Sequence, residues 1–284
     1  MHTISNVLRD AAITLKQYGV SIPDLDSKIL LAHYLDVSKE YLIINNDMKL
    51  SAEQLKEYSK LINRRGLGEP TSKIIQRREF YGREFIVNNY VLDPRPDSEL
   101  IIDVVKENFS KDKDIKILDL GTGSGCLIIT LLLEFENSLG LGLDISEMAI
   151  KVASINAGKY FNDDRLSFVV SNWLQSINIS SFDVIISNPP YIPNNQISKL
   201  SPEVKNFDPL LALDGGYDGL TCYENIIKQL KETKLNSETL IIMELFSENK
   251  DKVIESFITY GFDKDKIEIL KDYNNKDRLI FINQ

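Results

Sequence analysis

The chain has 284 residues, of which 43% are hydrophobic and 26% are charged, as in an ordinary soluble globular protein. This length exceeds what one compact core usually needs, so we expect one full-sized domain and a smaller one. The 42 acidic and 33 basic side chains give a formal net charge of -9. That charge argues against broad, non-specific nucleic-acid binding, which needs a cationic surface.

Cysteine and histidine are too scarce for a conventional zinc site, and we expect no metal. The chain has two histidines, and its two cysteines, Cys126 and Cys222, lie far apart. The stretch 1–10 lacks the long apolar core of a signal peptide, and the longest apolar run, 127–133, is too short to span a membrane. These features predict a cytoplasmic protein without membrane contact.

Residues 1–77 are predicted to form a small helical bundle. Apolar residues recur at helical spacing over 4–18, Gly19 ends that helix, and Pro23 begins the next. Ser38 fits the cap of a short third helix, and Ser51 with Gln54 fits a capping box, in which each side chain bonds a free backbone amide of the other residue.

Residues 78–94 change to a strand-forming composition, rich in Phe, Tyr, Ile and Val. The pair Asn88-Asn89 offers a turn within it. We therefore expect a short β-hairpin that links the helical bundle to the rest of the chain.

The remainder, 95–284, alternates apolar strands with helical stretches. The strand candidates are 115–120, 139–143, 166–170, 182–187 and 239–245. Their apolar runs are continuous rather than alternating, which indicates burial on both faces in a parallel sheet covered by helices. Two further runs, 266–270 and 278–283, flank a turn at Tyr273-Asn274-Asn275 and predict a terminal antiparallel hairpin. The fold class is thus α/β, a Rossmann-like, mostly parallel sheet plus a small N-terminal helical bundle.

A glycine-rich loop follows the first strand of that sheet and precedes a helix. It consists of Gly121, Thr122, Gly123, Ser124 and Gly125. Ligands of open parallel sheets bind at the carboxyl ends of the strands, and glycines let a ligand approach the backbone closely. The amides at the start of the following helix suit an anionic group, such as the carboxylate of a methionine moiety.

Asp144 ends the second strand about twenty residues later, where an acid binds a ribose diol. Taken alone, Asp144 fits a helix cap about as well. A nicotinamide dinucleotide and S-adenosylmethionine both suit this arrangement. Dinucleotide binders need Gly or Ala five residues after the first glycine, and Cys126 stands there, so we favour S-adenosylmethionine.

The tetrapeptide Asn188-Pro189-Pro190-Tyr191 follows the fourth strand and is the predicted reactive centre. An amide nitrogen is a poor nucleophile because its lone pair is delocalised into the carbonyl. The side-chain oxygen of Asn188 and the backbone oxygen of Pro189 can each accept one N–H of a planar NH2 group and so direct it toward a methyl donor. The same acceptors stabilise the positive charge that develops on the nitrogen.

Pro189 and Pro190 hold these acceptors rigidly, and Tyr191 offers a flat face to the acceptor group. A general base is not required, because the proton can leave after methyl transfer. The bland alternative for this segment is a proline turn in which Tyr191 merely packs. The order of the four residues, with the glycine loop upstream in the same sheet, favours the catalytic interpretation.

These residues resemble the release-factor glutamine methyltransferases, the HemK or PrmC family, along nearly the whole chain. The supporting segments are Gly68-Glu69-Pro70, Arg78-Glu79-Phe80-Tyr81-Gly82, Pro94-Arg95-Pro96-Asp97-Ser98-Glu99, Asp119 to Gly125, Asn188 to Ile192, and Ala212-Leu213-Asp214-Gly215-Gly216. The glycine loop is generic, and the tetrapeptide is shared with several amino-group methyltransferases. The Pro-Arg-Pro-Asp segment and the helical front domain discriminate this family from the others.

The resemblance implies methyl transfer from S-adenosyl-L-methionine to N5 of the glutamine in the Gly-Gly-Gln motif of class I peptide-chain release factors, a protein methylation in translation termination. It implies a class I methyltransferase domain over 95–284 and a front domain over 1–77 that helps to dock the release factor. By the resemblance, residues 121–125 line the cofactor, Asp144 holds its ribose, and Trp173 lies beside its adenine. Residues 188–191 bind the glutamine, and Asn188 also borders the cofactor.

Two positions depart from the family pattern. Ser98 stands where threonine is usual, which is a mild change. Asn172 stands where aspartate usually precedes the aromatic residue. Asparagine still accepts a hydrogen bond through its oxygen, so we expect weaker cofactor binding rather than its loss.

Other functions fit parts of the sequence. An amino-group methyltransferase acting on a nucleic-acid base, or on a glutamine of another protein, would use the same tetrapeptide. Acidity and the lack of a recognisable RNA-binding module count against nucleic acid. A nicotinamide oxidoreductase would need the missing third glycine, and a catalytically idle adaptor would be expected to have lost Asn188 or a loop glycine.

Overall fold

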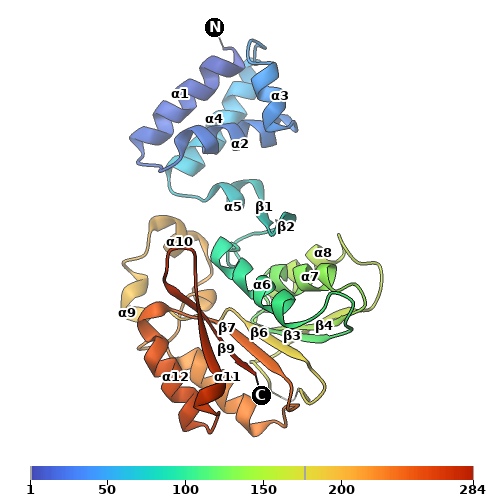
Figure 1. Ribbon diagram of the computed structural model, residues 1–284. Coiled ribbons are helices and arrows are strands. Elements are labelled where there is room, and N and C mark those ends of the chain that lie inside the picture. The colour runs from blue at the N-terminus through green and yellow to red at the C-terminus, as the bar shows by residue number, and fades with distance from the viewer. Residues whose placement is uncertain (1, 176, 284) are drawn as a thin grey trace. The chain divides into compact units, whose positions relative to one another are not determined.

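The computed structural model describes residues 2–175 and 177–283 (Figure 1). The chain divides into two compact units. One comprises the residues up to 77 together with 201–207, and the other comprises 78–200 together with the segment from 208 onward. The two units are described in turn.

The helical unit begins with the bundle that the sequence predicts. Its helices are α1 (Ile4–Gln17), α2 (Pro23–Leu35), α3 (Lys39–Ile44), α4 (Ala52–Gly66), α5 (Thr71–Ile75) and α10 (Pro202–Phe207). Pro23 is the first residue of α2, and the Ser38 side chain accepts from the backbone N–H of Tyr41. Ser51 and Gln54 form the expected capping box, with hydrogen bonds of 3.1 and 2.8 Å.

The core of this unit is made of one apolar face from each of the longer helices. Its fully buried members include Ile4, Leu15, Leu30 and Leu31. The predicted helical spacing over 4–18 is therefore the buried face of α1. Because each helix is too short to be stable alone, packing of these faces holds the bundle together.

A charged residue is also buried in this unit. The guanidinium of Arg65 lies 2.6 Å from Asp26 and 2.6 Å from Glu203, and the Arg65 and Asp26 side chains are both 5% exposed. Glu203 belongs to α10, so this ion pair fixes a segment that is distant in sequence to the helical unit. The helical spacing of the first 77 residues gave no indication of that contact.

We predict that Arg65→Met lowers the free energy of unfolding of the helical unit by about 3–5 kcal/mol, because it leaves the Asp26 carboxylate buried without a partner. Urea unfolding followed by circular dichroism measures the change. Arg64→Met is the matched control, since the Arg64 pair with Glu69 is half exposed and should contribute at most about 1 kcal/mol. Equal losses in the two variants would contradict the prediction.

The linking hairpin consists of β1 (Arg77–Phe80) and β2 (Arg83–Ile86). The turn between these strands is formed by Tyr81 and Gly82, with φ of 50° and 69°. The expected turn at Asn88-Asn89 is also present, since the Asn88 carbonyl oxygen accepts from Val91 N–H at 3.3 Å, but it follows β2 and does not join the two strands. Two consecutive positive φ values give a turn whose twist matches a two-residue hairpin, and glycine adopts one of them without strain. The backbone N–H and hydroxyl of Tyr81 donate to Glu99 and Asp103, which holds the tyrosine in its unfavourable conformation.

The second unit is built on a seven-stranded sheet of order β5-β4-β3-β6-β7-β9-β8. The strands are β3 (Lys116–Leu120), β4 (Leu139–Asp144), β5 (Leu166–Val170), β6 (Val184–Ser187), β7 (Leu240–Glu244), β8 (Ile267–Lys271) and β9 (Asp277–Asn283). Pairing is parallel from β5 to β7, and β9 is antiparallel to both β7 and β8. This confirms the mostly parallel sheet with a terminal antiparallel hairpin.

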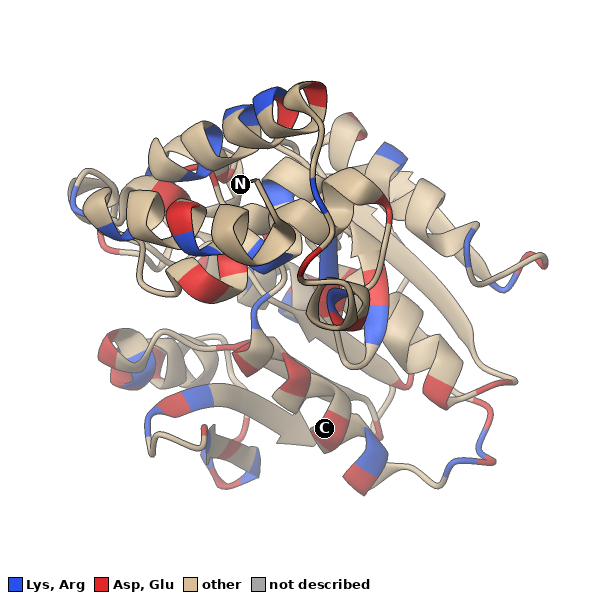
Figure 2. Cartoon of the chain, turned by 90° about the horizontal axis from the view of Figure 1, so that it is seen from above, with Lys and Arg blue, Asp and Glu red and all other residues tan. Residues whose placement is uncertain are grey.

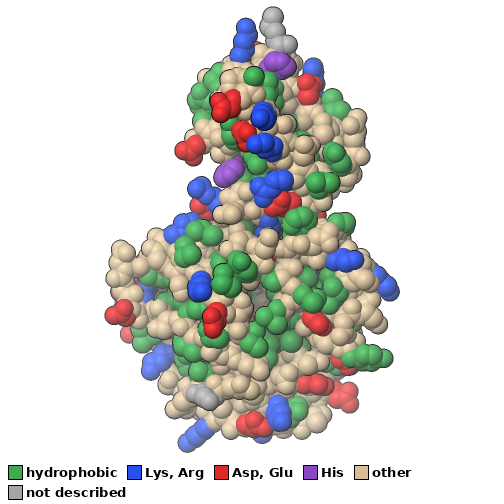
Figure 3. Space-filling model, turned by 180° about the vertical axis from the view of Figure 1, so that it is seen from behind, with side chains coloured by type: hydrophobic (Ala, Val, Ile, Leu, Met, Phe, Trp, Pro, Cys, Tyr) green, Lys and Arg blue, Asp and Glu red, His purple; other side chains and the backbone are tan. Residues whose placement is uncertain are grey.

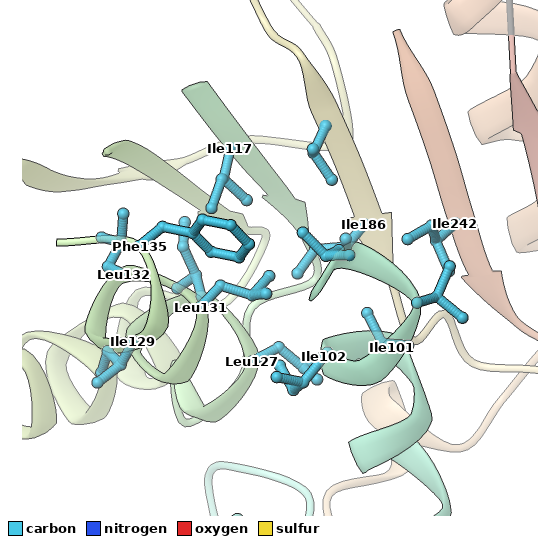
Figure 4. Packing of buried hydrophobic residues seen from close by; sticks show 14 of the residues in the cluster. Ile101, Ile102, Ile117, Leu127, Ile129, Leu131, Leu132, Phe135, Ile186 and Ile242 are labelled. Atoms are coloured by element: carbon cyan, nitrogen blue, oxygen red, sulfur yellow. The ribbon is translucent and has the colours of Figure 1, made fainter. Parts of the chain in front are cut away.

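Helices cover both faces of the sheet (Figure 1). The longer ones are α6 (Glu99–Asn108), α7 (Cys126–Glu134), α8 (Glu147–Ala157), α11 (Thr221–Glu232) and α12 (Lys250–Thr259). Single turns lie at Pro96–Ser98, Asn194–Ile197, Leu210–Ala212, Ser247–Asn249 and Lys264–Lys266. One buried cluster joins α6 and α7 to the side chains of Ile117, Ile186 and Ile242 (Figure 4).

The other cluster joins α11 and α12 to Leu118, Ile185 and Ile241, which are the neighbours of those residues along β3, β6 and β7. Successive residues of a strand point to opposite faces, so continuous apolar strands are what a doubly covered sheet requires. The edge strand β5 is the exception, because Val169 and Val170 are exposed.

Across residues 2–175 and 177–283, every helix falls short of the length or apolarity needed to cross a lipid bilayer.

Candidate functional site

The strand order brings the two predicted motifs to adjacent positions. Strand β3 lies between β4 and β6, and Leu120 at its end pairs with Leu143 of β4 and Ser187 of β6. The glycine loop, Asp144 and Asn188 each follow or end one of these three parallel strands. They therefore meet at one edge of the sheet, where ligands of such folds bind.

A cavity of about 340 Å³ within the second unit lies at this edge. The predicted site residues that line it are Gly121, Thr122, Gly123, Ser124, Asp144, Trp173, Asn188 and Pro190. Among the described residues, three other predicted site residues, Gly125, Pro189 and Tyr191, are not part of its lining. One cavity thus connects the glycine loop to the start of the tetrapeptide.

The three loop glycines all have positive φ, of 73°, 56° and 79° for Gly121, Gly123 and Gly125. Packing also requires glycine at position 125, because an added Cβ would lie 2.9 Å from Ile129 and 3.3 Å from Ala153 of the next two helices. Gly121 and Gly123 instead leave room at the cavity wall. The loop can therefore present bare backbone to a ligand.

Asp144 is held by two backbone amides. Its carboxylate accepts from Gly123 N–H and from Ser146 N–H, each at 2.9 Å. Burial raises the pKa of Asp144 above its usual range, and these backbone hydrogen bonds oppose that shift. The carboxylate is fixed at the cavity wall with further lone pairs available to hydroxyl groups.

Trp173 adopts the left-handed backbone conformation, with φ of 55°. A Cβ placed on Gly121 would lie 3.5 Å from the Trp173 ring, so the indole borders the glycine loop directly. Asn172 also lines the cavity. Backbone strain at a non-glycine residue persists only where the surrounding structure imposes it, and it is common at ligand sites. The position of the Trp173 indole is therefore set by the cavity rather than by local backbone preference.

Asp119, the last residue but one of β3, is fully buried. Thr122 Oγ1 donates to its Oδ2 at 2.7 Å, whereas its Oδ1 has no hydrogen-bond partner among the described residues. Burial raises the pKa of Asp119 to about 7, and the nearby Asp144 carboxylate contributes to the rise. Asp119 is therefore a carboxyl group whose charged form is poorly stabilised by its surroundings.

This carboxyl group makes stability depend on pH. The folded-state pKa of Asp119, about 7, lies above the value near 3.8 of an exposed carboxyl group. The contribution of Asp119 to stability is therefore fully present below the lower value and is lost as the pH rises toward the higher one. We predict that wild-type protein loses stability over this range relative to Asp119→Asn, by up to about 1.4 kcal/mol per pH unit. Denaturant unfolding at several pH values tests this, and parallel curves for the two proteins would contradict it.

The tetrapeptide is anchored from behind by buried polar groups. The Asn188 side-chain NH2 donates to Ser98 Oγ at 3.0 Å, and Ser98 Oγ donates to Glu244 Oε2. The Tyr191 hydroxyl donates to Glu244 Oε1 at 3.2 Å, and its ring stacks on Phe246 with centroids 5.6 Å apart and planes 4° apart. Tyr191 is therefore a packed support of the site rather than part of the cavity wall.

Sequence reasoning did not find Glu244. It ends β7 as the one charged residue of the strand Leu240–Glu244 and is 1% exposed. The same pattern, an acid at the carboxyl end of an apolar strand, singled out Asp144. That signal was available for Glu244 as well.

A second glycine-rich segment, 213–219, supports the tetrapeptide's backbone. Ile192 N–H donates to Leu213, and Gly215 N–H donates back to Ile192. An added Cβ at Gly219 would lie 2.4 Å from the Tyr191 carbonyl oxygen. Glycine is thus required where the two segments pass each other.

We predict that Gly219→Ala destabilises the second unit by about 2–4 kcal/mol, because it combines a positive φ with overpacking against Tyr191. Gly82→Ala is the control. Gly82 also has a positive φ, of 69°, but an added Cβ there has no described atom within 4 Å, so about 1 kcal/mol is expected. Thermal unfolding compares the two, and a smaller loss for Gly219→Ala would refute the close-approach argument.

Comparisons with known proteins decide the family. A model of the PrmC N-terminal domain matches residues 6–75, and a methyltransferase domain model matches residues 111–257. The release factor glutamine methyltransferase of Agrobacterium fabrum is 34% identical over 98% of this chain and 96% of its own length. The chain belongs to the release factor glutamine methyltransferase family. The Caulobacter vibrioides member is 34% identical over 94% of this chain and 91% of its own length.

Longer relatives also match. A bifunctional methyltransferase of Rickettsia conorii is 36% identical over 98% of this chain, which spans 57% of that protein. The chain thus spans little more than half the length of these bifunctional relatives. The front domain and the methyltransferase domain are the parts that all these proteins share with it.

Solved structures agree on the fold. A methyltransferase from Pyrococcus furiosus superposes with a TM-score of 0.52 at 16% identity, covering 78% of this chain and 98% of that one. The hMettl16 catalytic domain, solved with an RNA hairpin, gives 0.58 at 18% identity, covering 78% and 81%. At these identities the likeness establishes the methyltransferase fold alone.

The cavity residues fit S-adenosylmethionine, the methyl donor of this enzyme family. The bare backbone at Gly121 and Gly123 suits an amino-acid moiety. The fixed carboxylate of Asp144 suits a ribose diol, and the indole of Trp173 suits an adenine ring. Within the described parts of the chain, His, Cys, Asp and Glu nowhere gather into a group of three that could hold a metal ion.

Proposed function

We propose that this chain transfers a methyl group from S-adenosyl-L-methionine to the side-chain amide nitrogen, N5, of the glutamine in the Gly-Gly-Gln motif of class I release factors. The observation that carries the proposal is the single cavity lined by both the glycine loop and Asn188. Relatives named release factor glutamine methyltransferase align over 98% and 94% of the chain and support the choice of substrate.

Residues of the cavity take the following roles in this proposal. Gly121 to Gly125 and the start of α7 bind the carboxylate of the methionine moiety, Asp144 accepts from the ribose hydroxyls, and Trp173 packs beside the adenine. S-adenosylmethionine, when bound, supplies an electrophilic methyl group on a sulfonium ion. The remaining chemistry is done by the tetrapeptide.

Asn188 and Pro189 position the acceptor. Asn188 Oδ1 and the Pro189 carbonyl oxygen each accept one N–H of the glutamine amide, which aims the nitrogen at the methyl group. As positive charge develops on the nitrogen, both acceptors bind it more strongly, and this difference lowers the barrier. Pro190 stiffens the motif, and Tyr191, fixed on Phe246 and Glu244, holds its far end. The surplus proton leaves to water after transfer.

A protein substrate suits the surface around the cavity better than nucleic acid does. Leu210, Leu211 and Tyr217 are 59%, 55% and 88% exposed, and Leu211 lines the cavity itself. Hydrophobic side chains are prominent on the face shown in Figure 3, and basic and acidic residues are interspersed along the helices in Figure 2. Exposed apolar side chains at a cavity wall, such as Leu211, are typical of a protein-binding site.

The domain roles follow from this substrate. We propose that 1–77 docks the release factor, that 78–94 links the two parts, and that 95–284 carries the methyltransferase activity in the cytoplasm, without direct nucleic-acid or membrane contact. The match of 6–75 to the PrmC N-terminal domain supports the first assignment.

The substrate is tested by incubating the protein with labelled S-adenosylmethionine and either purified class I release factor, the same factor with its motif glutamine changed to alanine, or bulk RNA. We expect label in the intact factor alone. Label in the altered factor would place the reaction on another residue, and label confined to RNA would establish the base-methylating alternative.

The role of Asn188 is tested by Asn188→Ala. We expect cofactor binding, measured by calorimetry, to survive at least in part, while turnover falls by about 10²-fold or more because one of two acceptors for the amide is lost. Asp144→Ala is the matched comparison, since it should weaken cofactor binding first. Turnover of Asn188→Ala near the wild-type rate would refute the positioning role.

A further inference from the structure

Ser98 and Glu244 form a buried hydrogen-bond chain that ends on Asn188. Ser98 is 4% exposed and Glu244 is 1% exposed, and the two come from a turn before α6 and from the end of β7. The chain runs from the Asn188 NH2 to Ser98 Oγ and on to Glu244 Oε2. In the mechanism above Glu244 only supports Tyr191, and Ser98 has no role.

The direction of every hydrogen bond in this chain follows from Glu244. A carboxylate only accepts, so the single hydroxyl hydrogen of Ser98 must point to Glu244. Ser98 Oγ can then only accept from its other neighbour, Asn188, which must turn its NH2 toward Ser98. Since the two polar atoms of the amide lie on opposite sides of Cγ, Asn188 Oδ1 must point away from Ser98.

Each oxygen of the Glu244 carboxyl group accepts a hydrogen bond from a hydroxyl group, which is the arrangement of an accepting carboxylate, although burial raises the pKa of Glu244 overall. Arg278 acts on it electrostatically and pairs with Asp97 and Asp272 at 3.1 and 3.0 Å, while the Tyr191 hydroxyl donates to the other carboxylate oxygen. Burial and Asp97 raise the pKa of Glu244, whereas Ser98, Arg278 and Tyr191 lower it. The Tyr223 hydroxyl donates to the Glu244 backbone carbonyl and holds the end of the strand in place.

The orientation of Asn188 decides whether it can bind an amide NH2. With Oδ1 toward the acceptor it offers a lone pair to an N–H group. In the flipped orientation it would present its own NH2 to the NH2 of glutamine, which brings two donors together and removes the acceptor. A surface asparagine would lose this preference because both rotamers can bond water.

We propose that Ser98 and Glu244 are positioning residues that lock the side-chain amide of Asn188 with its oxygen toward the acceptor nitrogen. The catalytic consequence of this lock rests on the proposed glutamine methylation. The fixed orientation of the Asn188 amide is a property of the protein without substrate.

The lock is tested directly by nuclear magnetic resonance of the Asn188 side-chain NH2, assigned by its loss in Asn188→Ala. We expect Glu244→Gln to shift this signal although residue 244 makes no direct bond to Asn188, because a carboxamide has one oxygen for the two hydroxyl donors that converge there. Ser98→Ala should shift it as well. An Asn188 signal unchanged in Glu244→Gln would overturn the proposal, whatever the activity.

Turnover on the release factor is the second readout. We expect Ser98→Ala and Glu244→Gln each to lower kcat by about 10- to 100-fold, with cofactor affinity within about twofold of wild type. Ser98→Thr should restore most of the rate. In the Ser98→Ala background, Glu244→Gln should lower kcat by a smaller factor than it does in the wild-type protein, since both residues act through one chain of hydrogen bonds.

Thr239→Val is the control for general damage to the strand. Thr239 directly precedes the start of β7, at the opposite end from Glu244, and its hydroxyl donates to the Phe182 carbonyl oxygen at 2.9 Å, so this variant should lose stability but keep its kcat. If Ser98→Ala weakens cofactor binding as much as turnover, the residues are merely structural and the proposal fails. If wild-type protein shows the Asn188 lock but does not methylate the factor, the proposed function fails and the lock stands.

Discussion

Parallel pairing of β3 with β4 on one side and β6 on the other is the constraint on which the site depends. Parallel neighbours end at the same edge, so the loops that follow them must meet there, however far apart they lie in sequence. Residues 121, 144 and 188 reach one cavity for that reason alone. Apolar contacts on both faces of these strands, around Ile117 and Leu118, supply the burial that holds them in register.

Backbone hydrogen bonds and packing hold the groups around the cavity in place. Asp144 is held by two amides, and the tetrapeptide is supported by Phe246 below and the segment 213–219 beside it. Because these groups are held in place, their dipoles need not reorient when charge develops on a substrate. Dipoles fixed in this way stabilise a developing charge most effectively. A flat, uncharged amide is a weak nucleophile, and a site of this kind compensates for that weakness by geometry.

Much of the fold was readable from the sequence because local rules govern it. Continuous apolar runs predicted the strands β3 to β7, Pro23 predicted the start of α2, and Ser51 with Gln54 predicted a capping box. The hairpin turn was misplaced, since Asn88-Asn89 is a strong turn signal while Tyr81 adopts positive φ through its bonds to Glu99 and Asp103. There, long-range contacts overrode local preference.

The sequence predicts the site only in part, because some of its residues act through long-range contacts. Glycines at loop positions and the tetrapeptide carry their chemistry in short motifs, so spacing finds them. Ser98, Glu244 and Phe246 act through contacts between residues about 50 to 150 positions apart, and no local pattern encodes such a pairing. Their function depends on which strand ends meet, and that becomes visible when the sheet order is known.

The ion pair between Arg65 and Glu203 bears on how such a protein could be divided. Because α10 belongs to the helical unit, the polypeptide leaves that unit at residue 77, returns to it at 201 and leaves again at 207. A cut at residue 77 would therefore separate the sequence into two pieces without separating the two compact units. Recombination that exchanged residues 1–77 as one contiguous block would remove Arg65 and leave Glu203 without its partner. We therefore expect residues 1–77 and 201–207 to be inherited together.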